Sequence, residues 1–134
     1  MKILFMDDDK DRYLLLRMSL PVSVTINYCT NVVDAQDALV NHSFDLIMLD
    51  HDLGIGSPGG DGIELCKFIS RNLEDIKWKP DTNVVIHSMN PVGASNMIAE
   101  LAKSAIPVRY IPGAWSKIEG NDHIGYHIRL MRDH

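Results

Sequence analysis

Three short apolar runs that end abruptly in polar residues constrain the fold of this chain more than any other feature. The polar groups are Asp7-Asp8-Asp9 after residues 3–6, Asp50-His51-Asp52 after residues 46–49, and His87-Ser88 after residues 84–86. Short buried runs of this kind are typical of strands in a parallel sheet, whose carboxyl ends meet at one edge. Ligands bind at that edge in open α/β folds, so we expect the acids, imidazoles and hydroxyl to share one site.

The rest of the chain alternates between strand and helix patterns. The expected strands cover residues 2–6, 22–29, 44–49, 83–86 and 107–111, and the expected helices cover 11–20, 32–41, 61–72, 91–104 and 123–131. Within the second helix, Val33, Ala35, Ala38 and Leu39 are predicted to face inward. Five strand–helix repeats with short connections predict an α/β fold, a parallel sheet covered by helices on both faces. No repeat or linker divides the 134 residues, so we expect one domain, 1–134.

Charge and cysteine content narrow the class of ligand. The formal net charge is only −5, but seven acids lie near the predicted site: Asp7, Asp8, Asp9, Asp11, Asp50, Asp52 and Asp61. Such a site repels phosphate unless a cation neutralises it, which predicts a metal and argues against duplex nucleic acid as a partner. Two cysteines form no disulfide framework, and no apolar stretch is long enough to cross a membrane. We therefore expect a cytoplasmic protein without a membrane partner.

Asp7, Asp8 and Asp50 are the candidate metal ligands. Mg²⁺ prefers oxygen ligands and takes one or two carboxylates while it keeps positions for phosphate oxygens. The alternative is that these acids cap a helix or face solvent. For Asp9 and Asp11 we favour that alternative, because acids are common in the first turn of a helix.

Two histidines at neighbouring strand ends are candidates for proton transfer. His51 and His87 could divide the base and acid roles in opening a phosphodiester, since imidazole gains and loses a proton near neutral pH. The alternative is that one of them points into the core or ligates the metal. The other histidines, His42, His123, His127 and His134, are interpreted as surface residues.

A phosphate-binding group is predicted at the start of the helix led by Pro91. Ser88, Asn90 and the backbone at Gly93 lie there, where a helix presents unpaired N–H groups and a partial positive charge. Asn90 could equally serve as the helix cap. The glycine-rich segment 54–62 is predicted to be a flap over the site. Trp115 is predicted to fill space between the last strand and the last helix, and the alternative is that it stacks on a base.

Residues 2–9 and 45–50 resemble a response-regulator receiver domain, and the resemblance extends over nearly the whole chain. It implies a flavodoxin-like three-layer fold whose five-stranded parallel sheet has the order 2-1-3-4-5. It also implies that Asp7, Asp8 and Asp50 bind Mg²⁺ together with the backbone carbonyl of Asp52, and that Asp50 is the phosphate acceptor. The lysine expected just before Pro112 is replaced by Ile111.

Other motifs are similar to those of the cyclic-phosphate-processing receiver family. They are Leu49-Asp50-His51-Asp52-Leu53-Gly54, Gly60-Asp61-Gly62 and His87-Ser88-Met89-Asn90-Pro91-Val92-Gly93-Ala94. The resemblance implies action on a cyclic phosphate or cyclic nucleotide.

The leading hypothesis is therefore a metal-dependent phosphoesterase that uses Mg²⁺ or Mn²⁺. Asp7, Asp8, Asp50 and Asp52 are the expected metal ligands, His51, His87 and Asp50 the expected catalytic residues, and Ser88, Asn90 and Gly93 the expected substrate contacts. One alternative is a module that sequesters a cyclic nucleotide. The other is a divergent receiver that is phosphorylated on Asp50. Nothing in the sequence decides the oligomeric state.

Overall fold

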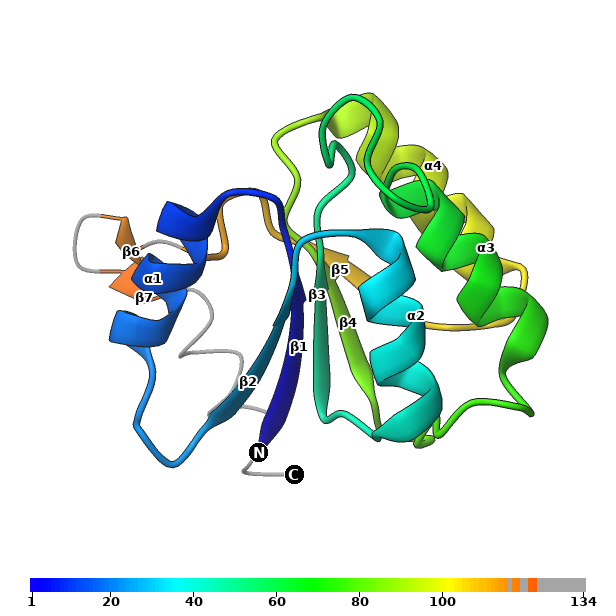
Figure 1. Cartoon of the computed structure of the whole chain (residues 1–134), viewed down its shortest axis with the longest axis horizontal. Coiled ribbons are helices and arrows are strands. Elements are labelled where there is room, and N and C mark those ends of the chain that lie inside the picture. The colour runs from blue at the N-terminus through cyan, green and yellow to red at the C-terminus, as the bar shows by residue number, and fades with distance from the viewer. Residues whose placement is uncertain (116, 119–120, 123–134) are drawn as a thin grey trace.

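A five-stranded parallel sheet forms the centre of the molecule (Figure 1). The computed structural model describes residues 1–115, 117–118 and 121–122. The strands are β1 (Lys2–Met6), β2 (Thr25–Cys29), β3 (Leu46–Leu49), β4 (Asn83–Ile86) and β5 (Val108–Tyr110). Their order is β2-β1-β3-β4-β5 with every neighbouring pair parallel, so the expected fold class and strand order are confirmed.

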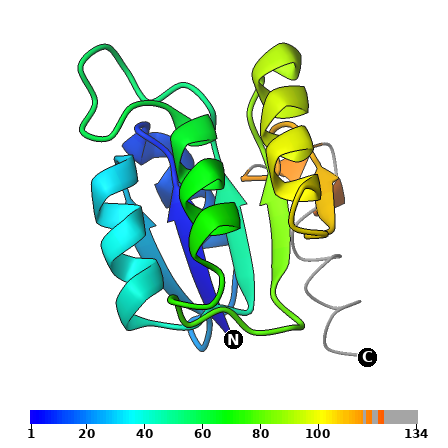
Figure 2. The ribbon, with the colours of Figure 1, turned by 90° about the vertical axis from the view of Figure 1, so that its right-hand side faces the viewer.

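Helices cover both faces of this sheet. They are α1 (Lys10–Ser19), α2 (Val32–Asn41), α3 (Gly62–Asn72) and α4 (Pro91–Ala102). The first lies on one face, and the other three lie side by side on the opposite face (Figures 1 and 2). A short antiparallel pair, β6 (Lys117–Ile118) and β7 (Asn121–Asp122), was not predicted. The helix expected over 123–131, which would contain His123 and His127, lies outside the described residues. His134 lies outside them as well.

Local sequence signals explain where three helices begin. The side chains of Asp9, Asn31 and Asn90 accept hydrogen bonds from backbone N–H groups in the first turns of α1, α2 and α4. These caps satisfy donors that a helix start leaves unpaired. Pro91 occupies the first turn of α4, where its missing N–H has no consequence.

Strand alternation divides the core into two clusters, one on each face of the sheet. On the α1 side, Phe5 and Val85 are buried together with Leu16 of that helix. On the other side, the intervening residues of the same strands pack beneath α2, α3 and α4. Residues i and i+2 of a strand share a face, which is why adjacent residues separate in this way.

The inward face of α2 and the start of β2 also differ from the sequence-based expectations. Val33 is 48% exposed, whereas Val32 is fully buried, because the inward stripe of α2 begins at Val32 and continues at Ala35. Strand β2 begins at Thr25 rather than at residue 22, because Thr25 pairs with Lys2, the first residue of β1. No helix formed by the described residues is long and apolar enough to cross a membrane.

Candidate functional site

Three carboxylates meet at the carboxyl ends of β1 and β3. Met6 pairs with Leu49, so the residues that follow them, Asp7 and Asp50, lie next to each other at the sheet edge. One carboxylate oxygen from each of Asp7, Asp8 and Asp50 lies within 4.8 Å of the other two. This spacing fits oxygen ligands around one hard divalent cation.

Burial makes this cluster electrostatically unfavourable by itself. Asp7 is 0% exposed and Asp50 is 4% exposed. Burial raises the pKa of Asp50 to about 6, and the nearby Asp7 carboxylate adds to the rise. Burial and the charge of Asp7 likewise raise the pKa of Asp8 above its usual value. Two of the three acids therefore lack the positive charge that would fully stabilise their ionised forms.

His87 is buried against Asp7 and is not at the site surface. Its Nε2 lies 3.0 Å from Asp7 Oδ2, and both side chains are 0% exposed. The imidazole also stacks on Phe5, with ring centroids 4.9 Å apart. Burial acts to raise the pKa of Asp7, but hydrogen bonds from His87 and from the Asp9 N–H outweigh this effect and hold that pKa below its usual value.

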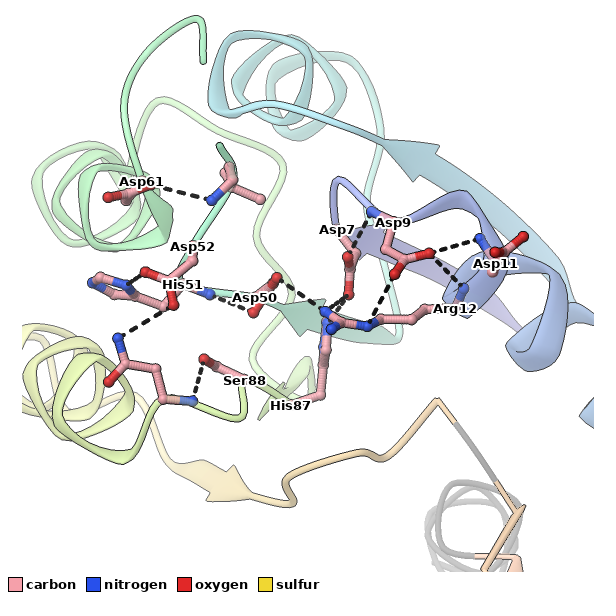
Figure 3. Close-up of polar contacts among 12 residues, drawn as sticks. Asp7, Asp9, Asp11, Arg12, Asp50, His51, Asp52, Asp61, His87 and Ser88 are labelled. Carbon is pink, nitrogen blue, oxygen red and sulfur yellow. Dashed lines mark hydrogen bonds and ion pairs between the residues drawn. The ribbon is translucent and has the colours of Figure 1, made fainter. Parts of the chain in front are cut away.

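His51 lies on the other side of the acidic cluster, between the first turns of α3 and α4 (Figure 3). Its Nδ1 is 2.9 Å from Asp52 Oδ1, and Asn90 Nδ2 donates to Asp52 Oδ2 at 3.3 Å. A Cβ atom on Gly93 would lie 2.5 Å from His51 Cγ, so the ring packs directly against the start of α4. The hydrogen bond with His51 lowers the pKa of Asp52.

A pocket of about 280 Å³ opens beside the acidic cluster. Its lining consists of Asp8, Arg12, Asp50, Asp52, Ser88, Met89 and Asn90. Carboxylate, hydroxyl and amide groups therefore face one hollow, whereas the strand-end pattern predicted carboxylates, a hydroxyl and two imidazoles there. Neither His51 nor His87 belongs to this lining.

The predicted phosphate-binding residues have local partners. Ser88 Oγ accepts a hydrogen bond from the Asn90 N–H, and Asn90 Oδ1 accepts one from the Gly93 N–H, each at 3.0 Å. Asn90 is thus the helix cap, and in this structure the Gly93 N–H is used by that cap. The side chains of Ser88 and Asn90 still line the pocket.

Arg12 is a site residue that the sequence patterns did not single out. Its Nη1 lies 3.5 Å from Asp7 Oδ2 and 3.7 Å from Asp50 Oδ2, and its Nε lies 3.5 Å from Asp9 Oδ2 (Figure 3). Arg12 could have been found because it lies in the first helical turn after Asp7-Asp8-Asp9.

Several other predicted residues lie outside the pocket lining. None of residues 54–62 lines it, and the N–H of Val33 donates to the Pro58 carbonyl of this loop, which therefore contacts the start of α2. Asp61 accepts a hydrogen bond from the Leu53 N–H and lies within 4.8 Å of ligand atoms on His51 and Asp52. Trp115 packs against the core cluster of the α1 face.

The fold is similar to that of solved receiver domains. It aligns with the signal receiver domain of an HD domain-containing protein from Pseudomonas fluorescens Pf-5, with a TM-score of 0.71, 20% identity and coverage of 99% of this chain and 87% of that one. It also aligns with the receiver domain of the Francisella response regulator 1452, with a TM-score of 0.65, 20% identity and coverage of 98% and 96%. The Mn²⁺-bound form of response regulator Rcp1 gives a TM-score of 0.59, 17% identity and coverage of 98% and 89%.

A match to a family model identifies the family of receiver domains to which the chain belongs. The cyclic-phosphate processing receiver domain matches residues 2–103, which include every pocket-lining residue. The chain belongs to this family. A search of curated proteins gave no significant match.

Proposed function

We propose that this receiver domain is a metal-dependent phosphoesterase that processes a cyclic phosphate or a cyclic nucleotide. The observation that carries the proposal is the pocket in which the acidic cluster adjoins Arg12, Ser88 and Asn90. Carboxylates for a cation and donors for phosphate oxygens thus adjoin one hollow. Membership of the cyclic-phosphate processing family supports the choice of ligand.

The donor set fits Mg²⁺ or Mn²⁺. Asp7, Asp8 and Asp50 would hold the ion, with the backbone carbonyl of Asp52 as a further ligand. A bound divalent cation would neutralise the carboxylates and polarise the phosphoryl group. The raised pKa of Asp50, about 6, supports the proposal because it reflects negative charge that the described side chains only partly compensate.

The chain's own residues would bind and orient the ligand. Ser88 Oγ and Asn90 Nδ2 would donate to the phosphate oxygens. Asp52 would hold His51 in one orientation and favour its action as a base, in the way that a carboxylate orients a catalytic imidazole. This requires the His51 ring to turn from its contact with Gly93 toward the pocket.

His87 would act on the reaction through Asp7. With Asp7 ionised, His87 Nε2 is the donor of their hydrogen bond, and this bond fixes one oxygen of the carboxylate. The other oxygen, Oδ1, accepts a hydrogen bond from the Asp9 N–H at 2.9 Å. We assign His87 the task of positioning Asp7, since its fully buried ring does not line the pocket.

A turnover screen tests the proposal. The protein would be incubated with 2′,3′-cyclic phosphates, cyclic mononucleotides and cyclic dinucleotides in Mg²⁺ or Mn²⁺, with products separated by chromatography. We expect ring opening of one class of substrate, lost in EDTA and in Asp8→Asn and retained in His42→Asn, a change at an exposed histidine outside the pocket lining. Absence of turnover for every class, with metal binding demonstrated by calorimetry, would overturn the proposal.

The placement of the histidines favours a second candidate, sequestration without cleavage. A pocket lined by neither imidazole can bind phosphate while it lacks a positioned base. Calorimetry that shows tight binding of a cyclic nucleotide, with the ligand recovered intact after prolonged incubation, would select sequestration over hydrolysis.

A further inference from the structure

The pocket lining carries a net negative charge that opposes the binding of an anion. Asp8, Asp50 and Asp52 contribute three carboxylates to its lining, whereas Arg12 contributes the one cationic side chain among the seven lining residues. A phosphate group that enters this hollow meets unfavourable charge at short range. Binding therefore requires both neutralisation of the carboxylates and a donor of positive charge aimed at the phosphate.

The guanidinium of Arg12 lies close to both central acids but is not tightly bonded to either. The distances from Nη1 to Asp7 Oδ2 and Asp50 Oδ2 are 3.5 and 3.7 Å. Charge-assisted hydrogen bonds are shorter, about 2.7–2.9 Å. These contacts are ion pairs that another cation could replace.

Two further contacts determine where this guanidinium lies. The Arg12 N–H donates to Asp9 Oδ1, which anchors the residue in the first turn of α1. Trp115 lies beneath the guanidinium, with Cζ 5.2 Å from the ring centroid, a distance at which the aromatic face attracts a cation. The side chain is 31% exposed, so it is held at the pocket edge and remains accessible to a ligand.

We propose that Arg12 is the anion-binding residue of the pocket, which contacts phosphoryl oxygens of the ligand when a divalent cation neutralises Asp7 and Asp50. The inference deepens the proposed function, because it rests on a phosphate ligand at the same site. The planar guanidinium can donate two parallel hydrogen bonds to one phosphate. Without phosphate, Arg12 competes with the metal for the carboxylates. With phosphate present, Arg12 and the metal both stabilise the bound phosphate.

This dual position predicts opposite changes in two affinities. In Arg12→Gln, Mn²⁺ should bind several-fold more tightly by calorimetry, because a positive charge next to two ligand carboxylates is removed. Inorganic phosphate, titrated at saturating Mg²⁺, should bind about tenfold or more weakly, the loss expected for a charge-assisted contact. Arg12→Lys should fall between Gln and wild type in both titrations, because it keeps the charge and loses the paired geometry.

The matched control is Lys10→Gln, which removes one positive charge from the same helix turn at an exposed residue outside the pocket lining. It should leave both affinities within about twofold of wild type, since exposed charges are well screened. Circular dichroism and thermal melting would verify the folding of each variant, and Arg12→Lys carries the test if Arg12→Gln does not fold.

Three binding results would overturn the inference: unchanged phosphate affinity in Arg12→Gln, weaker Mn²⁺ binding in that variant, or no phosphate binding to wild type at millimolar concentrations. The result of this test can be distinguished from the result of the turnover screen that tests the proposed function. Arg12-dependent phosphate binding without turnover of any cyclic substrate would retain the inference and remove the phosphoesterase. Turnover whose KM is unchanged in Arg12→Gln would do the reverse.

Discussion

Among single residues, Asp50 has the most unusual environment. Its pKa is raised to about 6 from 3.8, mainly by burial, so the folded state binds a proton more tightly than the unfolded state does. Stability from this group is present at low pH and declines as pH rises from about 4 to 6. With EDTA present, we expect Asp50→Asn to stabilise the protein at pH 7 by on the order of 2 kcal/mol and much less at pH 4. Urea unfolding at both values measures this.

The lowered pKa of Asp7 acts in the opposite direction, but only below its usual value of 3.8, outside that window. The raised pKa of Asp8 acts in the same direction as that of Asp50, so the difference between Asp50→Asn and wild type at the two pH values is what isolates Asp50. Equal stabilisation by Asp50→Asn at pH 4 and pH 7 would show that its carboxylate is not destabilised in the folded state.

The buried contact between His87 and Asp7 gives a second prediction at this scale. His87→Leu removes the imidazole that donates to a fully buried carboxylate. We expect a loss of about 1.5–3 kcal/mol in the free energy of unfolding, the range for hydrogen bonds to charged groups. His42→Asn, at an exposed histidine, should change stability by less than about 0.5 kcal/mol. Similar effects of the two changes in urea unfolding would contradict the importance of this contact.

Strand alternation explains why the sequence prediction placed some site residues better than others. The convergence of parallel strand ends correctly brought Asp7, Asp50 and Ser88 to one edge. It does not determine which way each side chain points. His87 has the same parity along the chain as Val85, which faces Phe5 and α1, and this parity could have placed the imidazole beneath the site.

At the scale of secondary-structure elements, two glycines allow α3 and α4 to begin close to the site. A Cβ on Gly62 would lie 2.0 Å from the Asp50 carbonyl oxygen, and its N–H donates to the His51 carbonyl at 2.7 Å. On Gly93, a Cβ would meet the His51 ring instead. Both positions therefore require glycine, because a Cβ atom there would overlap with the neighbouring atoms.

We expect Gly62→Ala to destabilise the protein by about 1–3 kcal/mol, because rigid backbone must move to relieve the overlap. Gly93→Ala should be milder, since a side chain can rotate away, and it should release His51 from its position beside α4. Urea unfolding measures the first effect, and the NMR chemical shifts of the His51 ring measure the second. Greater destabilisation by Gly93→Ala than by Gly62→Ala would contradict this difference.

The apolar runs and caps were sufficient to predict these elements, with errors mainly at their ends. Strand β2 depends on pairing with β1, and the inward face of α2 depends on helix phase. Neither is determined by a short window of sequence, because tertiary contacts select among local alternatives. The position of Arg12 could not be predicted for the same reason, because it depends on tertiary contacts with two strand ends and with Trp115.

For the whole molecule, the core controls the chemistry of the two cysteines. Cys29 and Cys66 are free and buried, and burial raises their pKa values to about 11 and about 12. The thiolate is the reactive form, so both should be nearly inert in the folded protein at pH 8. We expect no rapid reaction with a disulfide reagent in native buffer and two equivalents in urea. Fast modification of the native protein would show that the core opens readily.

The central claim is that one metal-assisted pocket at the strand ends binds phosphate. Crystals soaked with Mn²⁺ and a slowly hydrolysed cyclic nucleotide analogue test it most directly, through the anomalous signal of manganese. We predict one peak about 2.0–2.2 Å from carboxylate oxygens of Asp7, Asp8 and Asp50, with phosphate density between that ion, Arg12 and Ser88. A peak at His51, Asp52 and Asp61 instead, or no ordered ion at the strand ends, would contradict the claim.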